Sequence, residues 1–476
     1  MDTVKRITKN IGMSGISQLV VSILAFVLLI YIARYFGPAE FGVYSFAVSF
    51  TALFAVFADI GISQFMIRDI ARNKKLTAEY ITNVSIIKVI LSVITFGLIV
   101  LTINLMNYPS DVLYIVYLFG VYTILTSFSQ MLMSIFQAVE KMEYMAAVTT
   151  IEKLILTILG LYILFLGYDL IDLAYVYILS SVISVIISFF IVLKKISKPL
   201  PKINFPIWKT ITISSVPFGL NLLFGMLFFK IDTVLLSVLQ NDVAVGLYNA
   251  AYNPLLALGT IISGMVVSAI YPVMSRNFIS SKDSLGRFTV LNSRYMAIIG
   301  FPIAIGAFIL ADRFIELFYA NQYTGSIIAF QILALFIPIR LISSITGTLL
   351  TSINRQGIRM ISVLLSAIFN ILLNLALIPS LSYVGASIAT VLSEIFLYFT
   401  FIYFTNKYYH KLRLHNHFLK PLMASLIMGI IIFYLKGINL FLLFIMASLI
   451  YLSVLILLKT FNNEDKILFK QIFGRS

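Results

Sequence analysis

Long apolar runs, separated by short polar stretches, follow one another along almost the whole chain. A helix that crosses a bilayer needs about 20 mostly apolar residues. Membrane barrels would show short alternating segments instead, so the pattern predicts an all-α polytopic membrane protein with about 14 transmembrane helices. The first run is too long for the apolar core of a signal peptide, and we expect it to remain as the first helix. The fourteen runs lie near residues 11–35, 42–66, 82–104, 112–136, 146–167, 172–193, 210–238, 244–272, 290–310, 327–351, 360–379, 382–405, 418–435 and 439–459.

Composition agrees with this class, because 61% of the residues are hydrophobic and only 11% are charged, which soluble domains do not show. Lys and Arg accumulate in the cytoplasmic loops of membrane proteins. Most of the 34 basic residues lie at the chain ends or in loops on one side of the helices, such as "RDIARNKK" and "NKYYHKLRLHNHFLK". The opposite loops hold only Arg34, Arg313 and Lys436. We therefore expect a multi-pass protein of the cell membrane, plasma or cytoplasmic, with both termini in the cytoplasm.

Charge and residue usage narrow the chemistry. The net charge of +15 is explained by basic loops that face anionic membrane lipids, so no nucleic-acid partner is expected. Without cysteine, the chain has no thiol nucleophile and no thiolate metal site. The histidines His410, His415 and His417 share one basic loop, where a solvated loop is favoured over a metal site. No phosphate-binding G-x-x-x-x-G-K-[ST] loop occurs, and neither a cofactor nor a metal is expected.

A short repeat divides the chain. "EFGVYSFA" and "AVGLYNAA" place Gly42 and Gly246 at equivalent positions, 204 residues apart. Each glycine opens an even-numbered helix and the interval spans six helices, so both copies enter the membrane in the same direction. This pattern indicates two parallel six-helix lobes, as in many secondary transporters. We expect an N-lobe at 1–196, a proline-containing cytoplasmic linker at 197–209, a C-lobe at 210–406, and a segment at 407–476 with a basic loop, helices 13 and 14 and a cytoplasmic tail.

Four stretches carry a resemblance to a known family: "ARYFGPAEFGVYSFAVSF", "FADIGISQFMIRDIAR", "VPFGLNLLFGMLFFKIDTVLLSVLQNDVAVGLYNAAYNP" and "NILLNLALIPSLSYVGASIATVLSE". They resemble polysaccharide and O-antigen (lipid-linked oligosaccharide) flippases of the multidrug/oligosaccharidyl-lipid/polysaccharide exporter superfamily. That superfamily also includes multidrug-extrusion antiporters and peptidoglycan-precursor flippases. The resemblance implies a transporter, not an enzyme, that moves a lipid-linked oligosaccharide from the cytoplasmic to the outer leaflet by alternating access, for assembly of cell-surface glycans.

The first helix departs from one branch of these relatives. Peptidoglycan-precursor flippases carry cavity arginines in the first helix, whereas here this helix has no charge before Arg34 at its outer end. The departure favours a flippase for another glycan.

Four basic residues lie well inside the predicted spans, away from the span ends: Lys88, Lys153, Lys230 and Arg340. A basic side chain in the membrane costs about 2.5 to 3.5 kcal/mol on insertion scales and by default marks a functional site. A substrate on a polyprenyl phosphate or pyrophosphate carrier needs such cations where its charge crosses the membrane. Arg340 is the strongest candidate because it lies near the middle of its helix. Two alternatives stay open: Arg340 pairs with Glu394, and Lys88 and Lys153 extend to the nearby cytoplasmic interface.

Acidic residues inside the spans are candidates for coupling to H⁺ or Na⁺, namely Asp59, Asp232 and Glu394. For Asp59 in helix 2, an ion pair with a neighbouring helix is an equal alternative. Lys230 and Asp232 are two residues apart and point to different helix faces, so each needs another partner or a ligand. We expect Lys230 and Arg340 on the wall of a water-filled cavity between the lobes.

Uncharged polar residues in the spans are further candidates for this cavity, where they would bind sugar hydroxyls. They are Asn221, Asn249, Asn370, Asn374, Gln18 and Gln130. Hydrogen bonds between helices are the commoner use of such residues in membranes. The predicted spans of the N-lobe contain no proline, whereas helices 7, 8, 9 and 10 contain Pro217, Pro254, Pro302 and Pro338 respectively. These prolines predict bending in the C-lobe during transport, with static kinks as the alternative.

Two other functions stay open. A cation-coupled multidrug antiporter of the same fold would want an acidic cavity, whereas basic residues dominate in the middle of these spans. A membrane glycosyl or acyl transferase would need a base or metal-binding carboxylates near one interface, yet no His lies in a span and no D-x-D motif occurs. We expect a transporter that works as a monomer and uses a gradient or the membrane potential in place of ATP.

Overall fold

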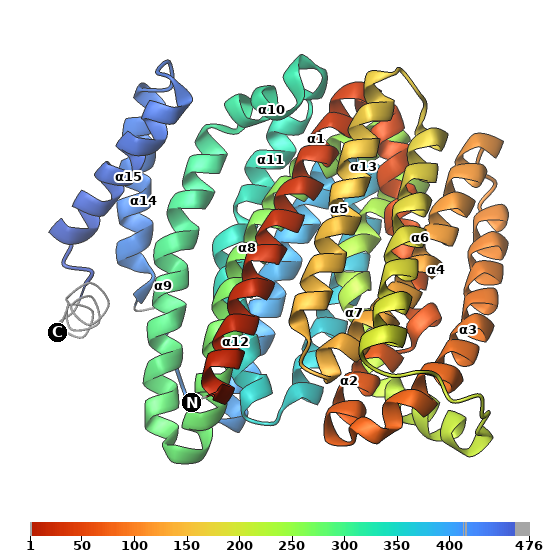
Figure 1. The fold of residues 1–476 in the computed structure, drawn as a ribbon. Coiled ribbons are helices and arrows are strands. Elements are labelled where there is room, and N and C mark those ends of the chain that lie inside the picture. The colour runs from red at the N-terminus through yellow and green to blue at the C-terminus, as the bar shows by residue number, and fades with distance from the viewer. Residues whose placement is uncertain (1, 413, 415–416, 462–476) are drawn as a thin grey trace. The chain divides into compact units, whose positions relative to one another are not determined.

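The computed structural model describes residues 2–412, 414 and 417–461 (Figure 1). Over these ranges every regular element is a helix. The helices are α1 (Asp2–Asp59), α2 (Ile62–Arg72), η1 (Lys74–Leu76), α3 (Thr77–Leu105), α4 (Ser110–Ala138), α5 (Met142–Phe165), α6 (Leu170–Lys195), α7 (Phe205–Leu239), α8 (Asp242–Ser280), α9 (Lys282–Ile309), α10 (Ala311–Tyr319), η2 (Ala320–Tyr323), α11 (Ser326–Ala334), α12 (Phe336–Ser352), α13 (Gln356–Tyr408), α14 (Leu419–Tyr434) and α15 (Leu440–Leu457). His415 and residues 462–476 of the expected C-terminal tail lie outside the described residues.

The helices account for the number of membrane crossings expected from the apolar runs. Eleven helical stretches among the described residues are long and apolar enough to cross a membrane, and α14 is a shorter apolar helix. α1 bends at Gly37 (φ 72°) and α13 bends at Ser382 (φ 51°), so each consists of two helical arms. Counting α14 and both arms of α1 and α13 gives fourteen apolar helical segments in the described part of the chain. The prediction of an all-α polytopic protein with about 14 transmembrane helices is thereby confirmed.

The chain divides into two compact units, residues 1–249 and 250–476, with the division inside α8. In the first unit, α1 packs against α3, α4, α5 and α7, while α6 packs against α4 and α5 (Figure 1). In the second unit, α12 packs against α9 and α13, and α14 packs against α9 and α15. Each unit therefore brings together helices that are distant in sequence.

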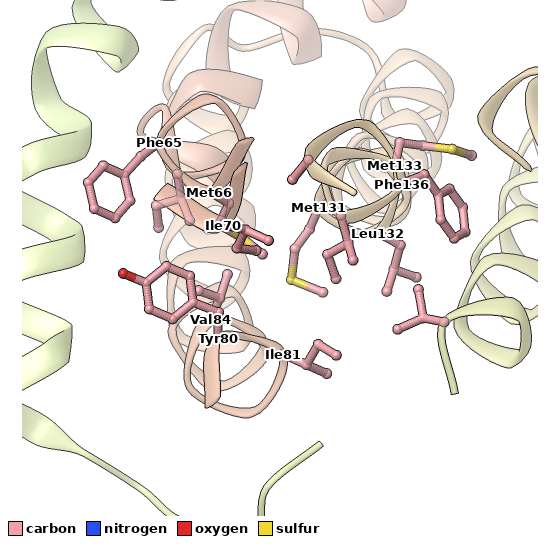
Figure 2. Packing of buried hydrophobic residues seen from close by; sticks show 14 of the residues in the cluster. Phe65, Met66, Ile70, Tyr80, Ile81, Val84, Met131, Leu132, Met133 and Phe136 are labelled. Carbon is pink, nitrogen blue, oxygen red and sulfur yellow. The ribbon is translucent and has the colours of Figure 1, made fainter. Parts of the chain in front are cut away.

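One core of the first unit lies where α2 meets α3 and α4 (Figure 2). α2 buries Ile62, Phe65, Met66 and Ile70, which follow the helical spacing of an amphipathic helix. Facing them are apolar residues of α3 and α4, including Tyr80, Ile81, Val84, Met131, Leu132 and Phe136. This packing fixes α2 against its neighbours, just beyond the end of α1.

α1 and α2 are separated by a break that the sequence pattern did not predict. The second arm of α1 ends at Asp59, and Ile60 and Gly61 have positive φ angles of 47° and 80°. A Cβ atom at Gly61 would lie 2.6 Å from the carbonyl oxygen of Ser215 in α7. Gly61 is therefore required both by its φ angle and by the close approach of α7. The apolar run at 42–66 was predicted as one span because Ile60, Gly61 and Ile62 at the break are all uncharged and lie between apolar stretches.

The four prolines singled out in the predicted C-lobe do not interrupt their helices in the same way. α7, α8 and α9 continue through Pro217, Pro254 and Pro302, and Pro338 lies in the first turn of α12. The helix break of the N-lobe instead depends on a glycine. The expectation that bending during transport concentrates in the C-lobe stays a prediction.

The repeated glycines both lie at a crossing of α1 with the start of α8. A Cβ atom at Gly42 would overlap the main-chain carbonyl of Asp242, and one at Gly246 would overlap that of Pro38. The two helices approach so closely that only glycine fits at either position. Gly42 lies at the start of the second arm of α1, just after the bend at Gly37, and Gly246 lies near the start of α8, so both are at the same end of a helical segment, as the parallel repeat predicts.

Candidate functional site

A cavity of about 250 Å³ opens within the first unit between the first arm of α1, α4 and α5. Its polar lining consists of Ser17, Gln18, Thr126, Ser129, Gln130, Thr149, Glu152 and Lys153. Three residues singled out from the sequence, Lys153, Gln18 and Gln130, thus lie around one cavity. The third basic candidate in the first unit, Lys230, is not among its lining residues.

The walls of this cavity are held by contacts between rigid helices. Ser17 Oγ of α1 donates to the Ala146 carbonyl of α5 at 3.2 Å and shares a hydrogen bond with Thr150 Oγ1 at 3.0 Å. A Cβ atom at Gly160 of α5 would lie 2.8 Å from Leu28 of α1, so these two helices are tightly packed. Site residues on such helices keep a defined geometry.

Among the described residues that line the cavity, Lys153 is the one cation. Its side chain is partly buried and, within the described residues, makes no hydrogen bond or ion pair. Glu152 is its neighbour in sequence, and hydroxyl and amide groups supply the remaining polarity. The arrangement combines one point charge suited to a phosphate oxygen with donors and acceptors suited to sugar hydroxyls.

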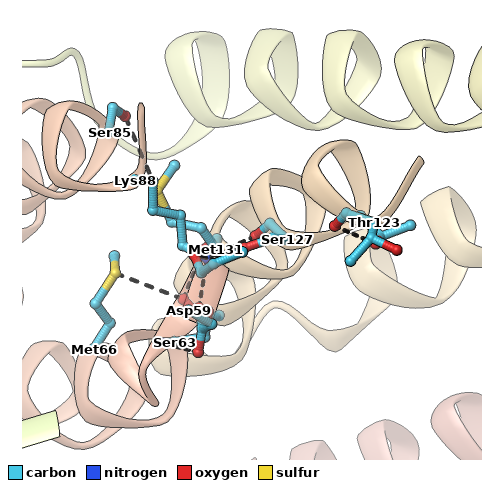
Figure 3. A network of polar contacts seen from close by, with 11 residues as sticks. Asp59, Ser63, Met66, Ser85, Lys88, Thr123, Ser127 and Met131 are labelled. Carbon is cyan, nitrogen blue, oxygen red and sulfur yellow. Dashed lines mark hydrogen bonds and ion pairs between the residues drawn. The ribbon is translucent and has the colours of Figure 1, made fainter. Parts of the chain in front are cut away.

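Lys88 and Asp59 form a buried ion pair in the same unit, with Lys88 Nζ 2.5 Å from Asp59 Oδ1 and both side chains almost inaccessible. Lys88 also donates to the carbonyl oxygen and the hydroxyl of Ser127, at 2.9 and 2.6 Å (Figure 3). The structure therefore has Lys88 directed to the break between α1 and α2. Of the alternatives left open by the sequence, the geometry corresponds to an ion pair for Asp59, and Lys88 does not extend to an interface.

Arg340 and Glu394 form an ion pair in the second unit. Arg340 Nη1 lies 3.5 Å from Glu394 Oε2, and Ser343 Oγ donates to Glu394 Oε1 at 2.9 Å. The Arg340 side chain keeps 17% of its surface exposed, whereas Glu394 keeps 3%. This pair was the alternative to a ligand-binding Arg340. It does not decide against binding, because a guanidinium has further donors.

The remaining predicted residues lie on α7, α8 and α13. Tyr248 donates a hydrogen bond of 2.9 Å to Asp232, and Thr233 donates one of 3.2 Å to Asn249. These bonds join α7 to α8 inside the first unit. Lys230 is partly buried and makes no hydrogen bond or ion pair in the described part of the chain, while Asn221 is exposed.

Asn370 and Asn374 are both buried in α13, where Asn374 Nδ2 donates to the Asn370 side chain at 3.0 Å. Asn249 thus takes part in a hydrogen bond between helices, the commoner use expected of such residues, whereas Asn370 and Asn374 bond to each other within one helix.

Sequence reasoning missed several polar residues of these sites. Ser127 and Ser63 complete the surroundings of the Lys88–Asp59 pair, and Glu152 lines the cavity. In the second unit, Arg359 donates to Thr351 Oγ1 of α12 at 3.1 Å. Serine and threonine occur throughout the spans, so only Gly61 next to Asp59, a helix breaker beside a charge, could have indicated the first of these sites.

A model of the family described as polysaccharide biosynthesis protein matches residues 7–278, which is more than half of the chain. The chain belongs to the polysaccharide biosynthesis protein family. This family member is 23% identical over 372 residues to the "Probable low-salt glycan biosynthesis flippase Agl15" of Haloferax volcanii, which covers 78% of the chain and 77% of that relative. It is also 23% identical over 288 residues to the uncharacterized membrane protein MJ1068 of Methanocaldococcus jannaschii, covering 59% of the chain and 57% of that relative.

Solved structures show the fold of this polysaccharide biosynthesis family member. The lipid II flippase MurJ in an inward closed conformation superposes with a TM-score of 0.75 at 16% identity, covering 96% of the chain and 99% of MurJ. An inward-facing multidrug resistance MATE family transporter of the MOP superfamily superposes with a TM-score of 0.65 at 16% identity, covering 87% and 98%. The chain therefore has the fold shared by MurJ and MATE transporters.

Proposed function

We propose that the protein is a flippase that moves a lipid-linked oligosaccharide from the cytoplasmic to the outer leaflet by alternating access, for assembly of a cell-surface glycan. Membership of the polysaccharide biosynthesis protein family supports this function. So do the name of the Haloferax volcanii relative, a glycan biosynthesis flippase, and the fold shared with MurJ.

The single observation that carries the proposal is the cavity around Lys153. A charged residue among transmembrane helices is expensive, and one that lines a polar cavity without an ion pair has no structural role to offset that cost. The lining by Gln18 and Gln130 supplies hydrogen-bonding groups for a glycan. Lys153 then binds a phosphate oxygen of the lipid carrier, and the amides bind sugar hydroxyls beside it.

Other parts of the proposal follow from the sequence. The carrier is a polyprenyl phosphate or pyrophosphate, and the transporter works as a monomer, without enzymatic chemistry, in the cell membrane. Both termini are cytoplasmic, and the basic loops contact anionic lipids. The lobes at 1–196 and 210–406 alternate between inward and outward access, with the linker at 197–209 between them. Lys230, Arg340 and Asn221 remain candidate substrate ligands, and Asp232 and Glu394 remain candidates for coupling to H⁺ or Na⁺.

A multidrug antiporter is the second candidate function, since MATE transporters share the fold and Glu152 places one acid at the cavity. An antiporter for organic cations would use Glu152 as the binding group and would be hindered by Lys153. Opposite effects of neutralising these two residues therefore distinguish the two functions.

The test is transport in liposomes that contain the purified full-length protein, with a fluorescent lipid-linked oligosaccharide and a fluorescent organic cation as separate substrates. We expect movement of the glycan lipid, and a loss of at least tenfold in its rate for Lys153→Gln. Lys141→Gln is the matched control, because Lys141 is exposed and pairs with Glu143 outside the cavity at 3.8 Å. Normal flipping by Lys153→Gln would reject the site. Transport of the cation alone, abolished by Glu152→Gln, would reject the flippase.

A further inference from the structure

The break between α1 and α2 exposes main-chain groups that an unbroken helix would satisfy. The last carbonyls of α1 and the first N–H groups of α2 lose their helical partners there. Away from water, each unsatisfied group of this kind is costly. The end of α1 is also the negative end of its helix dipole, and the start of α2 is the positive end of its own.

Asp59 satisfies the start of α2. Its Oδ2 atom accepts a hydrogen bond from the main-chain N–H of Ser63 at 3.3 Å, and its Oδ1 atom accepts one from Ser63 Oγ at 2.6 Å. A carboxylate at the positive end of a helix dipole is also favourable. Asp59 thus acts as the anionic cap of α2.

Lys88 satisfies the end of α1. Its ammonium lies 3.5 Å from the Ala58 carbonyl and also contacts Asp59 Oδ1 and both oxygens of Ser127. Ser127 Oγ in turn donates to the same Ala58 carbonyl at 3.0 Å. Four oxygens from α1 and α4 therefore surround one nitrogen from α3, and the Lys88 side chain is fully buried.

The kinds of oxygen around the Lys88 ammonium indicate what else could bind there. Two main-chain carbonyls, one hydroxyl and one carboxylate are ligands that a hard monovalent cation uses, and the carbonyl end of a broken membrane helix is a place where transporters bind Na⁺. The carboxylate balances a single positive charge. Lysine is a compact point charge on a flexible stem, so its ammonium can occupy the position of such an ion.

We propose that the break between α1 and α2 is a monovalent cation site that the Lys88 ammonium fills permanently. Because the cation is tethered to α3, the site neither loses it by dilution nor exchanges it with the solution. Asp59 then stabilises the break between α1 and α2 whatever ions the solution contains, and it does not couple transport to Na⁺. Shortening Lys88 should convert the filled site into one that takes up Na⁺ from solution. This inference does not depend on the transported substrate.

The experiment measures the thermal unfolding midpoint of the full-length protein in lipid nanodiscs, in NaCl, KCl and N-methyl-D-glucamine chloride at equal ionic strength. The wild type should unfold at the same temperature in all three salts. Lys88→Ala should unfold at a lower temperature in N-methyl-D-glucamine, and NaCl should raise its midpoint by about 2 °C or more. Lys88→Ala/Asp59→Asn should show no rise, because the carboxylate that balances the ion is gone.

Two results of these unfolding measurements would overturn the proposal. One is a Lys88→Ala protein whose midpoint is the same in all three salts. The other is a wild type that Na⁺ stabilises and whose response is lost in Asp59→Asn, because Asp59 would then bind an exchangeable ion. Lys88→Ser is the second variant, and its added hydroxyl should permit the same Na⁺ response. If neither variant accumulates in cells grown with NaCl, the proposal also fails, since the ion should replace the ammonium.

Discussion

Gly42 and Gly246 make equivalent contacts where α1 crosses the start of α8. Gly42 packs on the main chain of Asp242, and Gly246 packs on the main chain of Pro38, so each glycine meets the residue four positions before the other. The four residues form two pairs of equivalent repeat positions, Gly42 with Gly246 and Pro38 with Asp242, each 204 positions apart. The crossing of α1 and α8 thus has a local two-fold symmetry, and the repeat in the sequence has a structural reason in this contact.

The symmetry of this crossing predicts equal effects of equal substitutions. Gly42→Ala and Gly246→Ala should each lower the stability by about 1 to 3 kcal/mol, because a Cβ atom would overlap the facing carbonyl and force the helices apart. Thermal unfolding in nanodiscs measures the effect. Gly97→Ala is the control, since a Cβ atom there has nothing within 4 Å. Unchanged stability of both variants would show that the helices do not cross so closely.

A second prediction concerns the break between α1 and α2. Gly61→Ala should destabilise the protein by about 1 to 2 kcal/mol from its positive φ angle alone, and by more because α7 leaves no room for a Cβ atom. Gly225→Ala is the matched control within α7, where a Cβ atom meets open space and alanine should be neutral or slightly stabilising. A chain that tolerates both substitutions equally would not have a helix break at Gly61.

The third prediction separates the charge of the Lys88–Asp59 pair from its volume. Lys88→Met should cost about 3 to 5 kcal/mol, because it leaves the Asp59 charge buried without its partner. Lys88→Met/Asp59→Asn should regain most of that loss, since no charge then remains in the site. The unfolding midpoints of Lys88→Met, Asp59→Asn and the double variant give the coupling between the residues. Additive losses would mean that the two side chains do not interact.

A test of Arg340 requires variants that distinguish binding of the substrate from pairing with Glu394. Arg340→Gln should abolish flipping and destabilise the protein, because Glu394 loses its ion pair. Arg340→Gln/Glu394→Gln removes both charges and should restore stability. If Arg340 binds the phosphate of the substrate, the double variant should remain inactive while folded. Recovery of flipping together with stability would assign Arg340 a purely structural role.

We expect the stability of the protein to depend on pH through His417, in the loop before α14. Partial burial and the nearby Arg294 charge lower the pKa of His417 below its usual value of 6.5. The folded protein therefore binds this proton less readily than the unfolded chain, so stability is lost as the pH falls from about 6.5 through the folded pKa. His417→Gln should reduce this loss in unfolding experiments between pH 7 and pH 5, with His410→Gln as the control. An identical pH dependence in the wild type and His417→Gln would contradict the assignment.

The sequence was sufficient to predict the transmembrane helices, because each apolar run is long enough to specify a membrane span by itself. The parallel direction of Gly42 and Gly246 followed from counting the spans between them. The break at Gly61 was not predictable in the same way, because its cause is the contact with α7, more than 150 residues further along the chain. The residues around Gly61 in the sequence do not indicate a contact with α7.

The residues of the candidate site also differ in how far the sequence alone could predict them. A buried charge is visible in sequence, so Lys88, Lys153 and Arg340 could all be singled out. Glu394 could also be named as a partner of Arg340. The pairing of Lys88 with Asp59 and the isolation of Lys153 could not be predicted, since they depend on how α3, α4 and α5 pack. The oxygens around Lys88 come partly from the main chain, which no residue type reveals.

The measurement that tests the central claim most directly is flipping of a fluorescent lipid-linked oligosaccharide in liposomes without ATP, at a controlled membrane potential. Moving one negative charge outward across a potential negative inside is favourable by about 2.3 kcal/mol per 100 mV. We predict that the purified protein moves the labelled head group without ATP, and faster when the potential is negative on the loading side. Flipping no faster than in protein-free liposomes, or flipping that requires ATP hydrolysis by a partner protein, would contradict the account.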